Sequence, residues 1–319
     1  MKAEIGTDLE KAKHILLSDG IVAIPTETVY GLAANALSPL AVARIFEAKQ
    51  RPSFDPLIVH VPDLESALGL VIEFPEPARK LAQAFWPGPL TLILEKSPEI
   101  PDIVTSGHPT VGIRVPDHPL TLELLRTANI PLAAPSANPF GFVSPTSAEH
   151  VMEQLGNVVP YILNGGPCQV GLESTIIRFE DDEAVVLRLG GAPLEKIERI
   201  MGKPVKEIRT SSSKPDAPGM LIAHYSPGIK LLVGDVRVLL SQFDPERTGI
   251  ISFNTKYDQV PIENQQILSP DGDLEEAAAN LFGALRSFSH VDVILAERFP
   301  DSGLGLAIND RLKRAAASR

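Results

Sequence analysis

Lys49 and Arg51 lie two positions apart, after a predicted helix and before Pro52, which stiffens the turn. Lysine supplies a point charge, and arginine supplies a fork of donors that matches phosphate oxygens. The pair therefore suits a phosphate-binding site. It also suits a plainer role, because cations at the end of a helix stabilise the helix dipole.

A second polar segment, Ser136-Ala137-Asn138, directly follows a short apolar run at 131–135. In open α/β sheets, ligands bind beyond the carboxyl ends of strands, which favours a pocket wall at this position. Serine and asparagine are also common turn formers, so an ordinary turn is the alternative.

Arg114 and Arg188 are both embedded in apolar, strand-like runs. A buried arginine is costly unless an anion meets it. For Arg114 the anion is either a carboxylate of the protein or a carboxylate of a ligand, and the sequence leaves both possibilities open.

Other polar residues have weaker signals. His60 lies near the exit of a predicted strand, Thr28 follows another, and Ser174 begins a third. Each also fits a structural role, as a core histidine, a turn residue or a cap. Cys168 has no evident base beside it, so we do not expect a nucleophilic thiol. The chain has neither a GxxxxGK[ST] loop nor a GxGxxG segment, which are the usual nucleotide-binding motifs.

The elements that must position these residues alternate between helices and strands. Helical spacing covers 8–19, 38–49, 76–85 and 120–127, and strand-like runs cover 21–24, 57–61, 90–94, 111–115, 131–135 and 161–163. Segments 174–179 and 184–189 flank Asp181-Asp182 as a hairpin, so we expect a mixed sheet. After a Ser- and Pro-rich stretch at 209–218, strands at 230–233, 249–253 and 291–296 and helices at 274–288 and beyond 306 predict a second α/β unit.

Composition narrows the function classes. With 319 residues, two domains are the first expectation. A formal net charge of −11 disfavours direct binding to a nucleic-acid backbone, although small anions can still bind where cations gather. The single cysteine excludes an intramolecular disulfide and a Cys/His zinc cluster, which favours a reducing cytoplasm. No apolar run approaches the roughly 20 residues of a membrane span, so we expect a soluble protein.

Four motifs lie in order along the first 200 residues: Pro25-Thr26-Glu27-Thr28-Val29-Tyr30-Gly31-Leu32, Lys49-x-Arg51-Pro52, Pro135-Ser136-Ala137-Asn138 and Gly171-Leu172-Glu173-Ser174-Thr175. Together they closely resemble the YrdC/Sua5 family of threonylcarbamoyl-AMP synthases. Later segments resemble the linker and C-terminal domain of the longer Sua5 type: Ala217-Pro218-Gly219-Met220, His224-Tyr225-Ser226-Pro227 and Gly303-Leu304-Gly305-Leu306-Ala307-Ile308-Asn309-Asp310-Arg311-Leu312.

The resemblance implies a twisted mixed α/β sheet of the YrdC type that encloses a large positive cavity, and a smaller Rossmann-like α/β domain. We expect a catalytic domain over 1–205, a linker that crosses the active site over 206–228, and the C-terminal domain over 229–319.

The resemblance also implies an activity. The family joins L-threonine, bicarbonate and ATP, the last with Mg²⁺, into L-threonylcarbamoyl-AMP and releases pyrophosphate. A separate threonylcarbamoyl transferase complex then modifies adenosine 37 of tRNAs that read ANN codons. The enzyme itself would meet tRNA indirectly or weakly, in agreement with its acidic charge.

Carried over by position, the resemblance assigns Lys49 and Arg51 to catalysis by neutralising phosphate charge. The residues assigned to ATP are Lys49, Arg51, Asp55, Thr110, Ser136, Asn138, Ser144, Arg188 and Tyr225, the last reaching in from the linker. Those assigned to threonine are Thr28, His60, Arg114 and Ser174, with Arg114 opposite the carboxylate. No residue is assigned to a metal. Asp55 stands where many relatives have asparagine, and Leu189 where many have proline.

Two other functions compete. A hydrogenase-maturation carbamoyltransferase contains a similar module, but it also carries zinc-finger parts that need cysteine pairs. An RNA-binding or ribosome-assembly protein would show a basic surface signature, which this acidic chain lacks.

Overall fold

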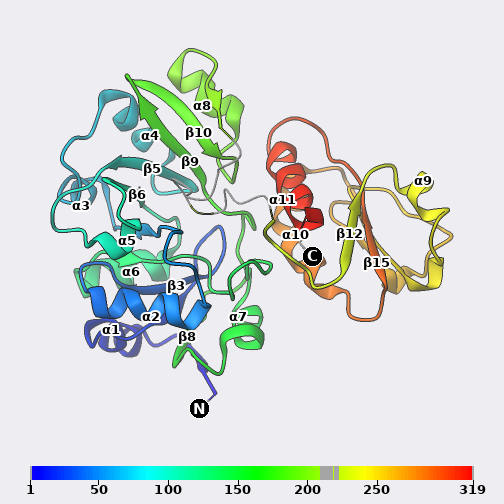
Figure 1. Cartoon of the computed structure of the whole chain (residues 1–319), viewed down its shortest axis with the longest axis horizontal. Helices are drawn as coiled ribbons and strands as arrows, with labels where there is room; N and C mark the ends of the chain where they lie inside the picture. The colour runs from blue at the N-terminus through cyan, green and yellow to red at the C-terminus, as the bar shows by residue number, and fades with distance from the viewer. Residues whose placement is uncertain (1, 209–217, 219–222, 318–319) are drawn as a thin grey trace.

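The computed structural model describes residues 2–208, 218 and 223–317, and it contains two β-sheets in two domains. Figure 1 shows the first domain, coloured blue to green, beside the smaller second domain, coloured yellow to red. The predicted two-domain α/β organisation is thus observed.

The first domain is built on an eleven-stranded sheet among the described residues. In spatial order its strands are β1 (Glu4–Gly6), β8 (Tyr161–Leu163), β2 (Val22–Ile24), β3 (Gly31–Asn35), β7 (Leu132–Ala133), β4 (Ile58–His60), β6 (Thr110–Arg114), β5 (Leu90–Glu95), β9 (Thr175–Glu180), β10 (Glu183–Arg188) and β11 (Lys206–Glu207).

The sheet is mixed, as predicted. β4 pairs with β6 in parallel, whereas β2 and β3, and β5 and β6, are antiparallel. The predicted hairpin is present as β9 and β10, with Asp181 and Asp182 both at positive φ in the turn. The short strands β1, β3 and β11 were not expected. β3 reads Gly-Leu-Ala-Ala-Asn, and these residue types have low β-propensity.

Helices surround this sheet: α1 (Leu9–Leu17), α2 (Pro39–Lys49), α3 (Leu64–Leu68), α4 (Glu76–Phe85), α5 (Asp102–Thr105), α6 (Pro119–Ala128), α7 (Ala148–Leu155) and α8 (Leu194–Met201). The helix α2 positions the two predicted phosphate-binding cations. It begins at the Ser38 cap, whose side chain accepts a hydrogen bond from the Ala41 N–H, and has Pro39 in its first turn. It ends where Gln50 takes a left-handed conformation, and the chain turns sharply between Lys49 and Arg51.

The second domain has a four-stranded parallel sheet in the order β12 (Lys230–Val233), β15 (Val293–Ala296), β13 (Thr248–Ser252) and β14 (Gln265–Ile267). Its helices are α9 (Val236–Leu240), α10 (Leu274–Ser287) and α11 (Gly305–Ala317), with single 3₁₀ turns η1 (Pro245–Arg247) and η2 (Ile262–Asn264). Parallel strands with helical connections agree with the Rossmann-like expectation.

The two domains pack closely against each other. Helices α10 and α11 lie between the second sheet and the first domain (Figure 1). Gly171 of the first domain lies so near α10 that a Cβ there would fall 2.4 Å from the Ala279 Cα, and its φ of +71° also favours glycine. One cluster of buried apolar side chains runs through both domains, and it includes Leu172 and Phe282.

The last strand of the first sheet ends at Glu207, and the second sheet begins at Lys230. The first sheet extends to Glu207, slightly beyond the predicted end of the domain at 205. Most of the predicted linker, 209–217 and 219–222, lies outside the described residues. Within 2–208, 218 and 223–317, no helix is long and apolar enough to cross a membrane.

Candidate active site

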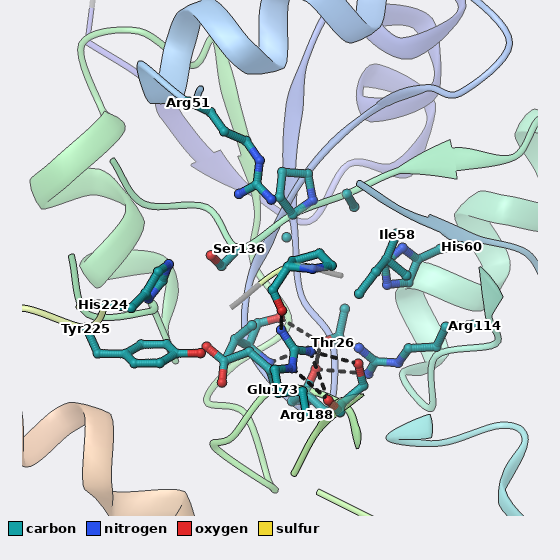
Figure 2. Close-up of a pocket in the computed structure, with 17 residues that line it drawn as sticks. Thr26, Arg51, Ile58, His60, Arg114, Ser136, Glu173, Arg188, His224 and Tyr225 are labelled. Atoms are coloured by element: carbon teal, nitrogen blue, oxygen red, sulfur yellow. Dashed lines mark hydrogen bonds between the residues drawn. The ribbon is translucent and has the colours of Figure 1, made fainter. Parts of the chain in front are cut away.

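A cavity opens at the carboxyl ends of several strands of the first sheet. Residues after β2 and β7 and at the ends of β4, β6 and β10 line it, and Pro218 and Tyr225 close it from the segment between the domains. Eight residues that the sequence assigned to substrates lie in this lining: Thr28, Arg51, His60, Arg114, Ser136, Ser174, Arg188 and Tyr225. Figure 2 shows their side chains converging from different sides.

Arg114 points into the cavity from the end of β6 (Figure 2). Its Nη2 donates to Glu27 Oε1 at 2.6 Å and to Thr28 Oγ1 at 2.9 Å, and its Nε donates to the Gly88 carbonyl at 3.2 Å. The sequence left open whether a protein or a ligand carboxylate meets this arginine, and the structure supplies the protein carboxylate, Glu27. Among the described residues Nη1 has no hydrogen-bond partner, so one face of the guanidinium group can still receive an anion.

His60 lies beside Arg114 in the cavity wall, since β4 and β6 pair with these two residues in register. Burial and the charge of Arg114 lower the pKa of His60 to about 3, so the imidazole is neutral. Its Nδ1 is buried and has no hydrogen-bond partner within the described residues. A buried ring nitrogen without a partner is unfavourable, and a ligand in the cavity would satisfy it.

Ser174 links the Arg114 side of the cavity to Arg188. Its hydroxyl pairs with Thr91 Oγ1 at 2.7 Å and accepts from Arg188 Nη2 at 3.2 Å, and its carbonyl also accepts from Arg188. Arg188 Nη1 donates to the Pro218 carbonyl at 3.1 Å. Burial lowers the pKa of Arg188 to about 10, which keeps it a cation at neutral pH.

Arg51 enters the cavity from the opposite side (Figure 2). Its Nη2 lies 2.9 Å from Asp55 Oδ2, its Nε donates to the Asp55 carbonyl at 3.0 Å, and the ring of Phe140 stacks on it at 6.0 Å. The Asp55 carboxylate is close enough for charge pairing, yet its oxygens accept no hydrogen bond from the described residues. Burial raises the pKa of Asp55. Asp55 lies behind Arg51 and outside the lining, so its assignment to ATP stays a prediction.

Lys49 does not line the cavity. Its ammonium group is buried and donates to the carbonyls of Ser136 and Asn138, which joins α2 to the Ser136-Ala137-Asn138 segment. Burial, and secondly the charge of Arg51, lower the pKa of Lys49 well below its usual value. In this conformation Lys49 shapes the wall that presents Ser136. A direct phosphate contact would require the ammonium group to leave at least one carbonyl.

Three further predicted ATP residues lie outside the lining. Asn138 Nδ2 donates to the Pro139 and Phe142 carbonyls and so folds the loop beside Ser136. Ser144 donates to Glu173 Oε1 at 2.6 Å. Thr110 begins β6, four residues before Arg114, which places it roughly 13 Å along the strand from the cavity. The structure does not bring Thr110 to the enclosed site.

Glu173 and His224 line the cavity although the sequence assigned them no role. Burial alone would raise the pKa of Glu173, but Arg311, Arg188 and the Ser144 hydroxyl lower it to about 2. Burial lowers the pKa of His224 to about 3. Both residues belong to motifs quoted above, and their position within these motifs could have identified them as lining residues.

Tyr225 reaches the cavity from the segment before β12, with its hydroxyl directed inward (Figure 2). Its ring stacks on Phe282 of α10 at 5.5 Å, and burial raises the pKa of its hydroxyl to about 12. Tyr225 therefore lines the cavity and is supported by α10, while its contact with ATP stays a prediction.

The cavity is built for anions. Among the described residues, three arginines and one carboxylate line it, in a chain whose formal net charge is −11. The described residues contain no group of three or more His, Cys, Asp or Glu side chains that could hold a metal ion. Bound anions would thus meet arginine side chains and hydroxyl groups.

Comparisons with known proteins match both domains. The family model described as "Telomere recombination", Sua5_yciO_yrdC, matches residues 14–190, and the model described as "Threonylcarbamoyl-AMP synthase, C-terminal domain" matches 192–317. A Bacillus subtilis protein named threonylcarbamoyl-AMP synthase is 43% identical over 98% of this chain and 93% of its own length. A Schizosaccharomyces pombe protein of the same name is 34% identical over 99% of this chain and 90% of its own.

Among solved structures, Pyrococcus abyssi Sua5 complexed with L-threonine superimposes with a TM-score of 0.90 at 40% identity, covering 98% of this chain and 94% of that one. Both domains of this chain, and the segment between them that contributes Tyr225, are thus shared with a two-domain relative. The chain belongs to the Sua5/YciO/YrdC family, in its longer form with the Sua5 C-terminal domain.

Proposed function

We propose that the chain joins L-threonine, bicarbonate and ATP into L-threonylcarbamoyl-AMP and releases pyrophosphate. Relatives of nearly full length carry this activity in their names, and a solved relative of the same fold holds L-threonine. The observation that carries the proposal is that Arg114 Nη1 and His60 Nδ1, on paired strands, lack hydrogen-bond partners among the residues described, in a cavity that also contains Arg51 and Arg188.

Threonine would bind at the Arg114 side. Nε and Nη2 of Arg114 hold its guanidinium group in place through hydrogen bonds to the protein. The remaining N–H donors of the group suit the carboxylate of an amino acid. The neutral imidazole of His60 and the hydroxyls of Thr28 and Ser174 can then bind the hydroxyl and amine of the substrate. Three fixed contacts of this kind favour one amino acid over its analogues.

The triphosphate would bind toward Arg51 and Arg188. Both arginines stay charged, and both are held rigidly by carbonyl oxygens. Charge that develops on the phosphates as the bond to pyrophosphate breaks would be stabilised by Arg51 and by Arg188, the latter after it exchanges a carbonyl contact for a phosphate oxygen.

The reaction balances in two steps. The threonine amine attacks the carbon of bicarbonate, giving a carbamate and water. A carbamate oxygen then attacks the α-phosphorus of ATP, and pyrophosphate leaves with the electron pair of the broken P–O bond. The protein's part is to orient the two reactants, which can supply several kcal/mol of the barrier reduction.

Mg²⁺ belongs to this proposal as the counter-ion of ATP. The described residues offer no carboxylate cluster for it, and Asp55 is already paired with Arg51. Magnesium in ATP sites is commonly held by phosphates and water, so we assign it no protein ligand and no step.

The product would serve a separate threonylcarbamoyl transferase complex, which modifies adenosine 37 of tRNAs that read ANN codons. A mixed anhydride of this kind is reactive toward water, so a cytoplasmic partner would take it over rapidly. The acidic charge of the chain fits a synthase that meets tRNA indirectly.

A product assay tests the proposal. Purified protein is incubated with ATP, Mg²⁺, L-threonine and ¹³C-bicarbonate, while pyrophosphate is measured and the adenylate is identified by mass spectrometry. We expect pyrophosphate release that requires both threonine and bicarbonate, and an adenylate that carries ¹³C. Arg247→Gln, an exposed change in the second domain, is the control variant. Release that is independent of threonine, or salt-sensitive tRNA binding with no adenylate, would refute the proposal.

A further inference from the structure

Arg311 of α11 is fully buried, although it belongs to the second domain. It reaches into the first domain, where its Nε donates to Glu173 Oε2 at 2.9 Å and its Nη2 donates to the Leu189 carbonyl at 2.8 Å. Its Nη1 donates to Asp310 at 2.9 Å, and its guanidinium group lies 5.2 Å from the centre of the Tyr225 ring. One side chain of the second domain thus contacts two residues that line the cavity.

The contact with Glu173 matters because of where that carboxylate lies. It faces a cavity that we assign to a triphosphate, and an uncompensated anion there would repel the nucleotide. Arg311 and the Ser144 hydroxyl each occupy one of its oxygens. Arg188 lies within electrostatic reach of the same carboxylate. Without Arg311, Glu173 would draw on Arg188 for its counter-charge.

We propose that Arg311 is a positioning residue for the reaction, supplied by the C-terminal domain. It neutralises Glu173 and supports the ring of Tyr225, so that the charge of Arg188 is not drawn to Glu173 and remains available to the nucleotide. This inference rests on the proposed function, since it concerns the nucleotide side of the same cavity.

The packing between the domains supports this role. The segment that carries Glu173 begins at Gly171, where the backbone lies directly on α10 and no side chain would fit. Tyr225, the other partner of Arg311, stacks on Phe282 of the same helix. The second domain therefore fixes both the backbone and the side chains of this wall of the cavity.

Calorimetric titration with a non-hydrolysable ATP analogue, and separately with L-threonine, tests the inference. We expect Arg311→Gln to weaken analogue binding about tenfold or more, and to change threonine binding by less than about threefold. Adding Glu173→Gln to Arg311→Gln should restore most of the analogue affinity, because the uncompensated carboxylate is then gone. A role confined to folding would not separate the two ligands in this way.

Arg286→Gln is the matched control. Arg286 lies on α10, and it also reaches into the first domain, where it donates to the Val143 carbonyl and to Gln154 Oε1. Neither Val143 nor Gln154 lines the cavity. Replacing Arg286 should leave the affinities for the analogue and for threonine within about twofold of the unmodified protein.

Circular dichroism shows whether Arg311→Gln folds. If it does not, Arg311→Lys is the second variant, because lysine keeps the charge but cannot reach Glu173 and the Leu189 carbonyl together. Arg311→Lys should weaken binding of the ATP analogue and leave threonine binding nearly unchanged. Unchanged analogue affinity in the folded variant, an equal loss for both ligands, or no rescue by Glu173→Gln would overturn the inference. Because these are binding measurements, they stand apart from the product assay. Failure of the unmodified protein to form the adenylate would refute the proposed function alone.

Discussion

The two sides of the cavity each present an arginine that is paired with a buried carboxylate, but they differ in what is left for a ligand. On the Arg114 side, Glu27 and the Gly88 carbonyl hold the guanidinium group, while Arg114 Nη1 and His60 Nδ1 have no hydrogen-bond partner in the part of the chain that the structure describes. The other cations at or near the cavity are occupied. Lys49, behind the Arg51 side, binds two carbonyls, and Arg188, which lies across the cavity from Arg51 (Figure 2), binds those of Ser174 and Pro218.

This difference indicates that the side proposed for threonine is preformed, whereas cations proposed for the nucleotide are held by contacts within the protein. A preformed site binds its ligand without a free-energy cost of rearrangement. A site whose side chains are already hydrogen-bonded within the protein must exchange those bonds for bonds to the ligand. We therefore expect threonine to bind in the absence of ATP. ATP binding should be accompanied by movement of Lys49 or Arg188.

Replacing Arg114 should have the largest effect on ligand binding among the changes on either side of the cavity. Arg114→Gln should abolish detectable threonine binding by calorimetry, since no other arginine replaces Nη1. It should also lower the free energy of unfolding by about 3–5 kcal/mol, because it leaves Glu27 buried and unpaired. Glu27→Gln is the matched variant, because it removes the pair and keeps the ligand donor. If Arg114→Gln and Glu27→Gln lose threonine binding equally, Glu27 is needed to orient Arg114 for the ligand.

Arg51→Gln tests the other side. It should lower kcat for pyrophosphate release by roughly 100-fold, as removal of one charge-stabilising donor does in other enzymes. Threonine affinity should stay within about twofold, since Arg51 lies across the cavity from Arg114. A variant with normal kcat would contradict the phosphate role of Arg51.

Acid titration probes the threonine side through His60. Its pKa is about 3 in the folded protein, below the 6.5 of a free histidine, so the unfolded chain takes up a proton first as the pH falls. Stability is then lost between about pH 6.5 and pH 3. Between pH 7 and pH 5 the unmodified protein should lose about 2 kcal/mol more of its free energy of unfolding than His60→Asn. Parallel denaturation curves for the two proteins would contradict a neutral, buried His60.

Lys49→Met tests whether Lys49 supports the cavity wall or contacts the phosphates directly. The ammonium group ties α2 to Ser136 and Asn138, so its loss should loosen the wall that carries Ser136. We expect ATP affinity to fall about tenfold and threonine affinity to be unchanged. A much larger loss of kcat with normal ATP affinity would favour direct contact between Lys49 and the reacting phosphate.

Local sequence patterns predicted most of the helices and strands. The cap at Ser38 and Pro39 predicted α2, and the apolar runs predicted the strands that carry His60 and Arg114. The order of the motifs predicted the family. The resemblance named the eight lining residues. They meet in space because the ends of neighbouring strands lie at one edge of a sheet.

The partners of the buried charges could not be predicted, because they depend on contacts between distant parts of the chain. Glu27 and Arg114 are 87 residues apart, and Glu173 and Arg311 are 138 apart. Lys49 was expected at the phosphates from its charge and from the family resemblance, but its ammonium group donates to two backbone carbonyls, which no side-chain pattern marks. Thr110 was carried over from the family, although it lies at the far end of its strand from Arg114.

A crystal structure with L-threonine and a non-hydrolysable ATP analogue bound together would test the central claim most directly. We expect the threonine carboxylate at hydrogen-bond distance from Arg114 Nη1, with β4 and β6 unmoved, and the triphosphate in contact with Arg51 and Arg188. A triphosphate bound to Arg114, with threonine at Arg51, would contradict this claim.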